Sequence, residues 1–318
     1  MMGYNISQLE SLCPSGFERN TSLAAISKWR IGGDADILLR PQSVEELAKL
    51  RSWFHQNSIP HLIIGSTSNL LFDDEGLRVP CIQIGERMSG IHIAADKVYA
   101  QAGAWVPKFS RRLMNSGLTG GEHVCGIPGT IGGLVYMNGG SQRRSIGSNI
   151  VSVESVDSKG DIITREVDEC EFSYRNSVYQ RTEEVITSAL FDFNIGERHS
   201  IRKNMLSILA ERKRKFPRGQ PNCGSVFKSD PDMYADIGPP GKVIELFGLK
   251  GKRVGKACVS SQHANFIVNE GGAKSADVLN LIKEISNCVV RESGYRLESE
   301  VLYVDPVGKL MPASSFFI

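Results

Sequence analysis

Residues 126–133 read GIPGTIGG, with four glycines and a proline in eight positions between two apolar stretches. Glycine lets the main chain turn through conformations that are closed to other residues, and it lets peptide N–H groups approach a ligand closely. The residues alone leave two interpretations open. The segment is either a tight structural turn, as most glycine-rich segments are, or a cradle for an anion.

The apolar pattern predicts three units along the chain. The first, residues 1–75, begins irregularly. It then has a strand over Ala35–Arg40, a helix from its cap Ser43 to about Asn57, and a buried strand in HLIIG that runs into a loop at residues 65–69. A strand, a helix and a second strand in this order are typical of the opening of an α/β layer.

The second unit, residues 76–196, changes to short strands around one helix, Val106–Ser116. The third unit, residues 197–318, has a helix over His199–Lys215, a middle rich in glycine and proline, and an amphipathic helix over Ser275–Glu292. It ends with a predicted strand in LESEVLYV. Ala276, Leu279, Ile282 and Ile285 share the predicted apolar face of the amphipathic helix. The predicted strands of the second unit are VPCIQIG, KVYAQAG, VSVESV, DIITREV and EVITSALFDF.

Composition excludes several classes of protein. The chain has 318 residues, of which 41% are hydrophobic and 23% charged, as in ordinary soluble proteins. No apolar run approaches the roughly 20 residues that cross a bilayer, and the start resembles no secretory signal, so we expect a cytoplasmic protein that contacts no membrane. Seven cysteines without a C-x-x-C pair argue against disulfides and against a metal site.

The net charge of +2 indicates no general attraction to nucleic acid. The basic stretch ERKRKFPRG, residues 211–219, is the local exception. It is either a solvated helix end or an edge that binds phosphate.

The common nucleotide fingerprints are absent. No G-x-G-x-x-G follows a strand, and Asp236 stands where a Walker motif ending in Gly241 and Lys242 needs its first glycine. Two other loops could hold phosphate, GSTSN at residues 65–69 and GIPGTIGG. Successive N–H groups in such turns form concave anion sites, and a diphosphate fits between two of them.

The ordered motifs of the chain resemble one known family. NTSLAAISKWRIGGDAD, GSTSNLL and GIPGTIGGLVYMNGG are followed by FSYRNSVY, CGSVFK, IELFGLKGKRVGKACVSSQHANFIVNEGG and GYRLESEV. Together they cover nearly the whole chain from Asn20 to Val304, and they are similar to the motifs of UDP-N-acetylenolpyruvoylglucosamine reductase. The short interval between Arg175 and Ser225 resembles the branch of that family that lacks an extra tyrosine-bearing loop.

The resemblance implies an α+β protein, with a two-lobed FAD-binding fold of the vanillyl-alcohol-oxidase type followed by a smaller α/β substrate-binding domain. It implies non-covalent FAD, NADPH as hydride donor, no metal and an enolpyruvyl UDP-sugar as substrate, and we expect a monomer. Three positions match the family's catalytic residues. Arg175 would pair with the substrate carboxylate, Ser225 would protonate the carbanion, and Glu300 would favour the enolate-type intermediate.

A strand through LESEV would put Glu298 on the same face as Glu300, and Ser299 on the other. Without the motifs, Arg175 would be read as a structural ion pair and Ser225 as a turn residue. For His263 a hydrogen-bonded structural role and a ligand contact remain equally open. The residues that would bind FAD are Ile31, Gly32, Gly33, Gly65, Ser66, Thr67, Ser68, Asn69, Leu70, Gly126, Ile127, Pro128, Gly129, Thr130, Gly132, Gly133 and Asn138. Those that would bind the UDP-sugar or the nicotinamide cofactor are Lys228, His263, Asn265, Arg214 and Arg218.

One residue departs from the family pattern. The first phosphate loop of the family reads G-x-G-S-N, and Thr67 stands at the second glycine. A β-branched residue suits a positive φ poorly. We therefore expect an ordinary φ at Thr67, and the alternative is weaker flavin binding.

Two rival functions remain. Another FAD-dependent oxidoreductase on the same scaffold would need a base and a route for oxygen, and a covalent flavin link would require a residue such as Cys125, just before Gly126. We read Cys223, beside Ser225, as a packing residue. A non-catalytic binding protein is the third hypothesis, and Thr67 is its only support. The sequence assigns no role to the C-terminal stretch LMPASSFFI.

Overall fold

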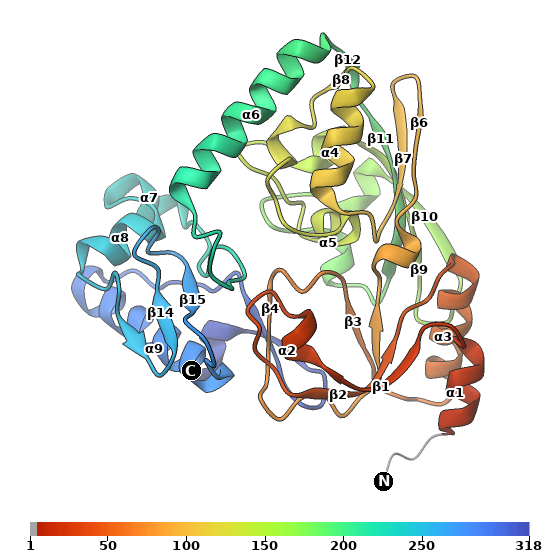
Figure 1. Cartoon of the computed structure of the whole chain (residues 1–318), viewed down its shortest axis with the longest axis horizontal. Helices are drawn as coiled ribbons and strands as arrows, with labels where there is room; N and C mark the ends of the chain where they lie inside the picture. Colours follow the sequence, from red (N-terminus) through yellow and green to blue (C-terminus); the bar gives the residue numbers. More distant parts are fainter. Residues whose placement is uncertain (1–4, 318) are drawn as a thin grey trace. The chain divides into compact units, whose positions relative to one another are not determined.

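The computed structural model of the chain describes residues 5–317, apart from the side chain of Phe317. Its contacts divide the chain into two compact units, described separately below (Figure 1). Unit 1 comprises Met1–Glu18, Leu38–Ser66 and Cys81–Arg212, and unit 2 comprises Arg19–Ile37, Thr67–Pro80 and Lys213–Ile318. Each unit is discontinuous along the chain. The division into the continuous stretches 1–75, 76–196 and 197–318 stays a prediction.

Unit 1 contains a small parallel layer. The end of β2 (Asp34–Leu39) and β3 (Leu62–Ile64) both pair in parallel with β5 (Cys81–Gln83), which lies between them. Helix α3 (Val44–Gln56) connects β2 to β3 along the chain, and the Ser43 hydroxyl caps it by accepting the Glu46 N–H at 3.2 Å. The predicted strand, helix and strand are confirmed.

The predicted irregular start is wrong. Helix α1 (Ile6–Leu12) packs on α3, and β1 (Phe17–Ser22) and α2 (Leu23–Ile26) follow it. The Asn5 side chain caps α1 by accepting the Gln8 N–H at 3.2 Å. Because α1 and α2 have only seven and four residues, their apolar periodicity is too short to stand out in the sequence.

A five-stranded antiparallel sheet forms the main layer of unit 1. Its order is β10-β9-β11-β7-β6, and Figure 1 shows α4 and α5 beside it. The rings of Phe109, Phe191 and Phe193 lie 5.1–6.1 Å apart in its core. The predicted short strands and the predicted helix Val106–Ser116 are confirmed, but the prediction of one helix in this region is wrong, because α5 is a second one. The elements are β6 (Ile91–Ala94), β7 (Lys97–Gln101), α4 (Val106–Asn115), β8 (Leu118–Thr119), α5 (Ile131–Tyr136), β9 (Ile150–Val156), β10 (Ile162–Glu166), β11 (Val185–Asp192) and β12 (Asn194–Ile195).

Helix α6 (Arg198–Lys215) follows β12, as predicted. Within unit 1 its residues Ile201, Met205 and Ile208 are buried together with Cys125. The last three residues of α6 already belong to unit 2.

Unit 2 is built around one long helix, α9 (Ser275–Ser293), which ends at Gly294 with φ +78°. It packs on a sheet of order β13-β14-β15. Ala276 is exposed, so its predicted place on the apolar face is wrong. The buried residues of α9 are Ser275, Val278, Leu279, Leu281, Ile282, Ile285 and Val289. The other elements are α7 (Pro231–Asp236), α8 (Pro240–Leu246), β13 (Arg253–Val254), β14 (Ala257–Val259) and β15 (Ile267–Asn269).

The end of the chain joins a second sheet of unit 2. Strand β16 (Leu302–Val304) pairs in parallel with β4 (Leu70–Phe72) and antiparallel with β17 (Leu310–Pro312), and the short helix η6 (Ala313–Phe317) follows. The predicted closing strand LESEVLYV is thus only partly correct. Its regular part begins at Leu302, while Ser299 forms an isolated bridge with Phe227.

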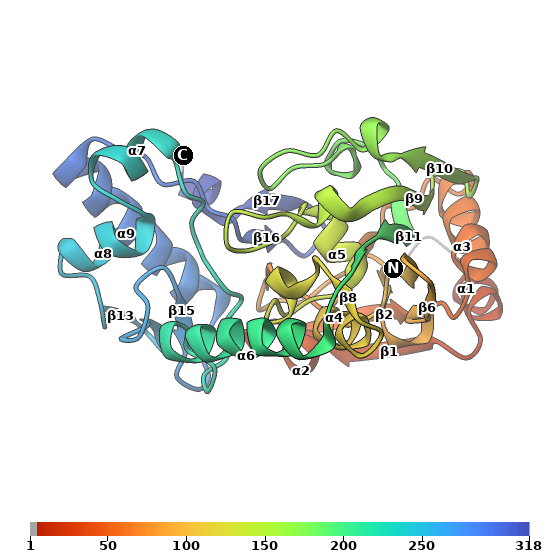
Figure 2. The same ribbon diagram turned by 90° about the horizontal axis from the view of Figure 1, so that it is seen from above.

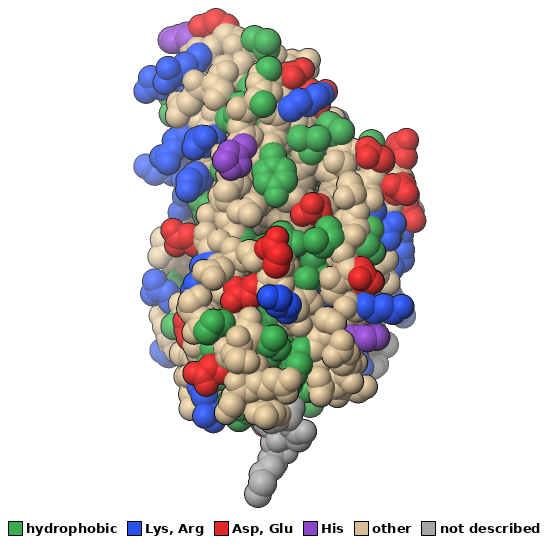
Figure 3. Space-filling model, turned by 90° about the vertical axis from the view of Figure 1, so that its right-hand side faces the viewer, with side chains coloured by type: hydrophobic (Ala, Val, Ile, Leu, Met, Phe, Trp, Pro, Cys, Tyr) green, Lys and Arg blue, Asp and Glu red, His purple; other side chains and the backbone are tan. Residues whose placement is uncertain are grey.

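The surface carries charges of both signs. On the face drawn in Figure 3, acidic and basic side chains are interspersed, in keeping with the net charge of +2. Among residues 5–317, no helix has both the length and the apolar character needed to cross a membrane.

Candidate active site

The glycine-rich segment Gly126–Gly133 lies in unit 1 and leads into α5. Thr130 is the N-cap of this helix, and its Oγ1 accepts the Gly133 N–H at 3.4 Å. The N–H groups of Ile131 and Gly132 donate to main-chain oxygens of residues 104 and 102, at 2.8 Å each. Those of Gly129 and Thr130 have no acceptor among residues 5–317. The segment is therefore both a structural turn and a source of unused donors.

The segment 65–70 contributes a second set of donors. Gly65 belongs to unit 1, and a Cβ built on it would lie 2.8 Å from Thr130 Oγ1. A side chain at residue 65 would fill the space beside the other glycine segment. In unit 2, the N–H groups of Ser68 and Asn69 have no acceptor in the described part of the chain. Unpaired N–H groups on glycine-rich turns fit an anionic group such as the FAD diphosphate.

The prediction of an ordinary φ at Thr67 is wrong. Its φ is +58°, a left-handed conformation that costs a β-branched residue on the order of 1–3 kcal/mol. Thr67 is 3% exposed, and its hydroxyl donates to the carbonyl of Ile26 at 3.0 Å. Cys223 Sγ packs against the same turn, 3.6 Å from the carbonyl oxygen of Thr67. Packing and a hydrogen bond thus hold Thr67 in the conformation that glycine adopts readily.

The turn at Ile31, Gly32 and Gly33 lies in unit 2. Ile31 is buried, and Gly32 has φ +131°. A Cβ on Gly32 would lie 2.8 Å from that of Phe72. Both glycines are therefore required by close packing, and a role for this turn in binding flavin stays a prediction.

Asn138 connects three segments of unit 1. It is 5% exposed, its Nδ2 donates to the carbonyl of Ser173 at 2.9 Å, and its Oδ1 accepts the Gly147 N–H at 3.0 Å. The side chain thus holds the segment that carries Arg175. Its predicted contact with FAD is not tested by these bonds.

Arg175 itself has φ +54°. Gln180 holds it there, because its Nε2 donates to the carbonyls of Arg175 at 3.0 Å and of Tyr136 at 2.9 Å. Ser177 donates to the same Tyr136 oxygen at 2.7 Å. The Arg175 guanidinium lies over the exposed Tyr174 ring, 5.5 Å from its centre. The Arg175 turn is therefore tied to the last residue of α5, the helix that begins at the glycine-rich segment.

Ser225 and Glu300 lie on two paired segments of unit 2. The Glu300 N–H donates to the Val226 carbonyl at 2.7 Å, and the Lys228 N–H donates to that of Glu298 at 2.9 Å. The Asn69 side chain donates to the Glu300 carbonyl at 2.8 Å. Ser225 and Glu300 thus come from neighbouring extended segments, and residue 69 of the phosphate segment is bound to the Glu300 peptide.

The residues predicted to bind substrate have different surroundings. Lys228 Nζ forms an ion pair with Glu298 Oε1 at 2.6 Å. Asn265 is 6% exposed, and its side-chain amide donates to the Phe227 carbonyl and accepts the Phe227 N–H, at 2.9 and 3.0 Å. It therefore fixes the segment that carries Ser225.

His263 packs against two phenylalanines and is partly buried. Its ring lies 5.3 Å from that of Phe216 and 5.1 Å from that of Phe266, and its Nδ1 accepts the Asn265 N–H at 3.2 Å. Burial, and then the charge of Lys250, lower the pKa of His263 below its usual range. These contacts account for a structural histidine, and the ligand contact stays a prediction.

The basic stretch is exposed at Arg214 and Arg218. Gln262 holds its main chain, because Nε2 donates to the carbonyl oxygens of Lys213 and Arg214 at 3.1 and 2.9 Å. This contact fixes the end of α6 within unit 2. The binding of phosphate by these arginines stays a prediction.

No disulfide joins the seven cysteines, all of which lie within the described residues. Cys223 is 5% exposed and belongs to the core of unit 2, which confirms its packing role. Cys125 is 3% exposed and packs against α6. Its place in this core supplies no support for a covalent flavin link.

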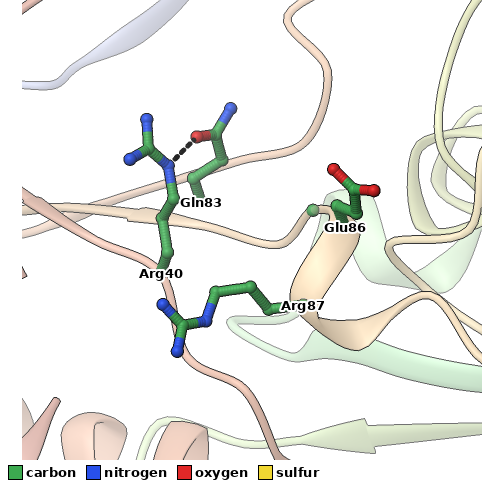
Figure 4. Close-up of a pocket in the computed structure, with 5 residues that line it drawn as sticks. Arg40, Gln83, Glu86 and Arg87 are labelled. Atoms are coloured by element: carbon green, nitrogen blue, oxygen red, sulfur yellow. Dashed lines mark hydrogen bonds between the residues drawn. The ribbon is translucent and has the colours of Figure 1, made fainter. Parts of the chain in front are cut away.

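Unit 1 also contains a pocket of about 340 Å³ that involves none of the predicted site residues (Figure 4). Arg40, Gln83, Gly85, Glu86 and Arg87 line it. Gln83 accepts the Arg40 Nε–H at 2.8 Å and donates to the Gly65 carbonyl at 3.3 Å, so it links the pocket to the phosphate segment. In Figure 4 the Glu86 carboxylate points away from the Arg87 guanidinium.

Sequence reasoning missed His123, three residues before Gly126. Its Nδ1 lies 3.0 Å from the carbonyl oxygen of Gly120, so Nδ1 carries the proton and Nε2 is a bare acceptor. Nε2 is buried and has no donor among residues 5–317. A histidine in this sequence context gives no signal of such an unfilled acceptor. Gln180 was also missed, because its hydrogen bonds to the carbonyls of Tyr136 and Arg175 depend on the tertiary structure.

Comparison with known proteins identifies the family. Residues 35–165 match a family described as "FAD binding domain", and residues 216–304 match "UDP-N-acetylenolpyruvoylglucosamine reductase, C-terminal domain". The chain is 43% identical over 297 residues to UDP-N-acetylenolpyruvoylglucosamine reductase 1 of Corynebacterium glutamicum, a match that covers 93% of this chain and 89% of the relative. It is 35% identical over 283 residues to the reductase of Carboxydothermus hydrogenoformans, covering 89% and 92%.

A solved structure gives the same result. The crystal structure of UDP-N-acetylenolpyruvylglucosamine reductase from Thermus caldophilus superimposes with a TM-score of 0.75 at 27% identity, over 90% of this chain and 97% of that one. The predicted α+β class, with an FAD-binding fold before a separate C-terminal domain, is confirmed by these matches. The chain belongs to the UDP-N-acetylenolpyruvoylglucosamine reductase family.

Proposed function

We propose that this protein reduces UDP-N-acetylglucosamine enolpyruvate to UDP-N-acetylmuramate, a precursor of peptidoglycan, with NADPH as the hydride donor. The observation that carries the proposal is the 43% identity to a reductase of this name over 93% of the chain. The likeness extends over both the FAD-binding region and the substrate domain. We further propose a cytoplasmic monomer of the branch that lacks the extra tyrosine loop.

FAD is the implied cofactor, and the chain offers groups that fit it. We propose that the N–H groups of Ser68 and Asn69 and those of Gly129 and Thr130 hold its diphosphate. Their lack of acceptors among residues 5–317 supports this assignment. When bound, FAD supplies hydride transfer from NADPH to the enolpyruvyl group. The binding is non-covalent, and the burial of Cys125 in a protein core agrees with that.

Three residues of the chain stabilise the negative charge that develops on the substrate and supply the proton that it takes up. Hydride arrives at the methylene carbon, so negative charge develops on the adjacent carbon and its carboxylate. Arg175 pairs with this carboxylate through its planar fork of donors. The Ser225 hydroxyl gives its proton to the carbon, and Glu300 beside the carboxylate favours the enolate-type intermediate. The pairing of the segments that carry Ser225 and Glu300 supports their joint action.

The substrate's UDP group needs cations. We propose that Arg214 and Arg218 bind its diphosphate and that Lys228, His263 and Asn265 belong to the same binding site. The exposure of both arginines supports the first assignment. Lys228 is paired with Glu298, so its charge is already partly balanced before substrate binds.

An anaerobic stopped-flow experiment tests the proposal. Purified protein reconstituted with FAD is reduced with NADPH and then mixed with the enolpyruvyl UDP-sugar, and flavin absorbance is followed. We expect rapid reoxidation by this substrate. The variant Ser225→Ala should keep flavin reduction by NADPH and lose roughly 10²–10⁴-fold in reoxidation rate.

Other outcomes separate the rival functions. A reduced flavin that reacts with oxygen but not with the UDP-sugar would indicate another FAD-dependent oxidoreductase. A colourless protein that cannot be reconstituted with FAD would indicate a binding protein without this activity. Unchanged reoxidation in Ser225→Ala would remove the serine from the proton-transfer step.

A further inference from the structure

The C-terminal segment of the chain packs directly on the residues around Glu300. This segment, here called the tail, comprises β17 and η6, Leu310–Phe317. Leu302, Tyr303 and Val304 of β16 pair with Pro312, Met311 and Leu310 of the tail, and Figure 2 shows the two strands side by side. The Ala313 N–H donates to the Val301 carbonyl at 3.0 Å, directly after Glu300.

Two serines close the contact on the other side of Glu300. The Ser299 N–H donates to Ser314 Oγ at 3.1 Å, and the Ser314 N–H donates to Ser299 Oγ at 3.0 Å. Ser299 Oγ in turn donates to the Val301 carbonyl at 3.0 Å. Ser299 is 1% exposed, so these bonds are shielded from water.

The peptide of Glu300 is therefore held from several directions. Its N–H is bonded to the Val226 carbonyl next to Ser225, and its carbonyl is bonded to Asn69. The residues before and after it are bonded to the tail. A reacting group that must be placed within a fraction of an ångström needs a rigid peptide beneath it.

We propose that the tail supports the active site through Ser314, which is the positioning residue that fixes Glu300. This inference rests on the proposed function of Glu300. Ser314 accepts a hydrogen bond from the Ser299 N–H, and its own N–H and hydroxyl donate to the Ser299 hydroxyl oxygen. No other side chain of the tail exchanges hydrogen bonds with one partner in both directions in this way, among the described residues. Loss of the Ser314 hydroxyl leaves the buried Ser299 N–H without its acceptor and frees the peptide before Glu300.

The test uses full-length holoenzyme and three variants. Ser314→Ala should slow reoxidation of the reduced flavin by the enolpyruvyl UDP-sugar by roughly tenfold, because a displaced reacting group costs rate steeply. Flavin reduction by NADPH should keep its wild-type rate. Ser314→Thr, which keeps the hydroxyl, should restore most of the rate. Ser315→Ala is the matched control, since Ser315 is exposed and its hydroxyl donates to the Pro312 carbonyl, within the tail itself, at 2.7 Å.

Hydrogen exchange supplies a readout that is independent of activity. In Ser314→Ala the amides of residues 299–301 should exchange faster than in wild type, while those of α9 should not change. Faster exchange throughout unit 2, or an equal loss in both half-reactions, would show a general loosening and overturn the proposal. Equal behaviour of Ser314→Ala and Ser315→Ala would overturn it as well.

The two proposals fail in different ways. If wild-type protein does not reduce the UDP-sugar, the proposed function fails, and the exchange experiment still reports whether the tail holds residues 299–301. If wild type is active and exchange at these residues is unchanged in Ser314→Ala, only the tail proposal fails.

Discussion

His61 makes the stability of unit 1 depend on pH. Its ring stacks on Phe54, with the ring centres 4.3 Å apart. Nδ1 lies 3.1 Å from the Ile59 carbonyl oxygen and must carry the proton, while Nε2 accepts a hydrogen bond from Arg51 Nη1. Arg51 is itself 4% exposed and also donates to the carbonyl of Asp157 at 3.1 Å. A second proton on His61 would break the bond to Arg51 and put two cations together.

The pKa of His61 gives the size of the pH effect on the unfolding free energy. Burial, followed by the charge of Arg51, lowers the pKa of His61 from 6.5 to about 4. In the unfolded chain the group titrates near 6.5, so between pH 6.5 and 4 the unfolded state binds the extra proton and the folded state does not. The contribution of neutral His61 to the unfolding free energy is thus fully present above pH 6.5, and it is lost as the pH falls from 6.5 to about 4. One pKa unit is worth about 1.4 kcal/mol, so the total loss is about 3 kcal/mol.

Two measurements check this reasoning. An NMR titration of the His61 ring protons gives the pKa in the folded protein. Urea unfolding at several pH values gives the slope of the unfolding free energy, to which His61 should contribute about 1.4 kcal/mol per pH unit between pH 6 and 4.5. His61→Gln is the control, because an amide oxygen can accept from Arg51 and does not titrate. That variant should lose the corresponding part of the slope. A folded-state pKa near 6.5, or an unchanged slope in His61→Gln, would refute the argument.

Three further predictions concern the site. Thr67→Val keeps the shape of the side chain and removes the donor to Ile26, so it should lower the unfolding free energy by about 1–3 kcal/mol in urea titrations, and no loss would mean that the hydroxyl is dispensable. Asn138→Ala removes two buried hydrogen bonds and should cost about 2–4 kcal/mol by the same assay, with a loss under 1 kcal/mol arguing against its clamping role. Arg175→Lys should slow flavin reoxidation by the UDP-sugar by roughly 10²-fold, since an ammonium lacks the planar fork, and a near-normal rate would argue against carboxylate pairing.

Local patterns predicted those elements whose signals are local. Ser43 and two glutamates in the first turn predict helix α3. Short runs rich in apolar and β-branched residues predict strands such as β9 and β11 of the five-stranded sheet. Errors arise where tertiary contacts decide. Ala276 fits the apolar periodicity of α9, yet Val278 and Leu281 occupy the buried face instead. The left-handed φ of Thr67 is stabilised by Ile26, 41 residues away, which no local rule detects.

The site shows the same limit. The order of motifs predicted the family, which the comparisons confirm. The catalytic roles of Arg175, Ser225 and Glu300 that the resemblance implies stay a prediction. The residues that hold these three, such as Gln180, Asn265 and Ser314, have no sequence signature, because their partners are backbone groups brought together only by folding. Side-chain bonds to the main chain depend on position rather than on residue pattern.

The parallel pairing of β16 with β4 has a consequence for biosynthesis. Residues 70–72 are synthesised long before their strand partner, residues 302–304, because the two strands are far apart in the sequence. The hydrogen bond from the Asn69 side chain to the Glu300 carbonyl likewise forms only after residue 300 has been made. A nascent chain therefore cannot form this strand pairing until residues 300–304 have left the ribosome.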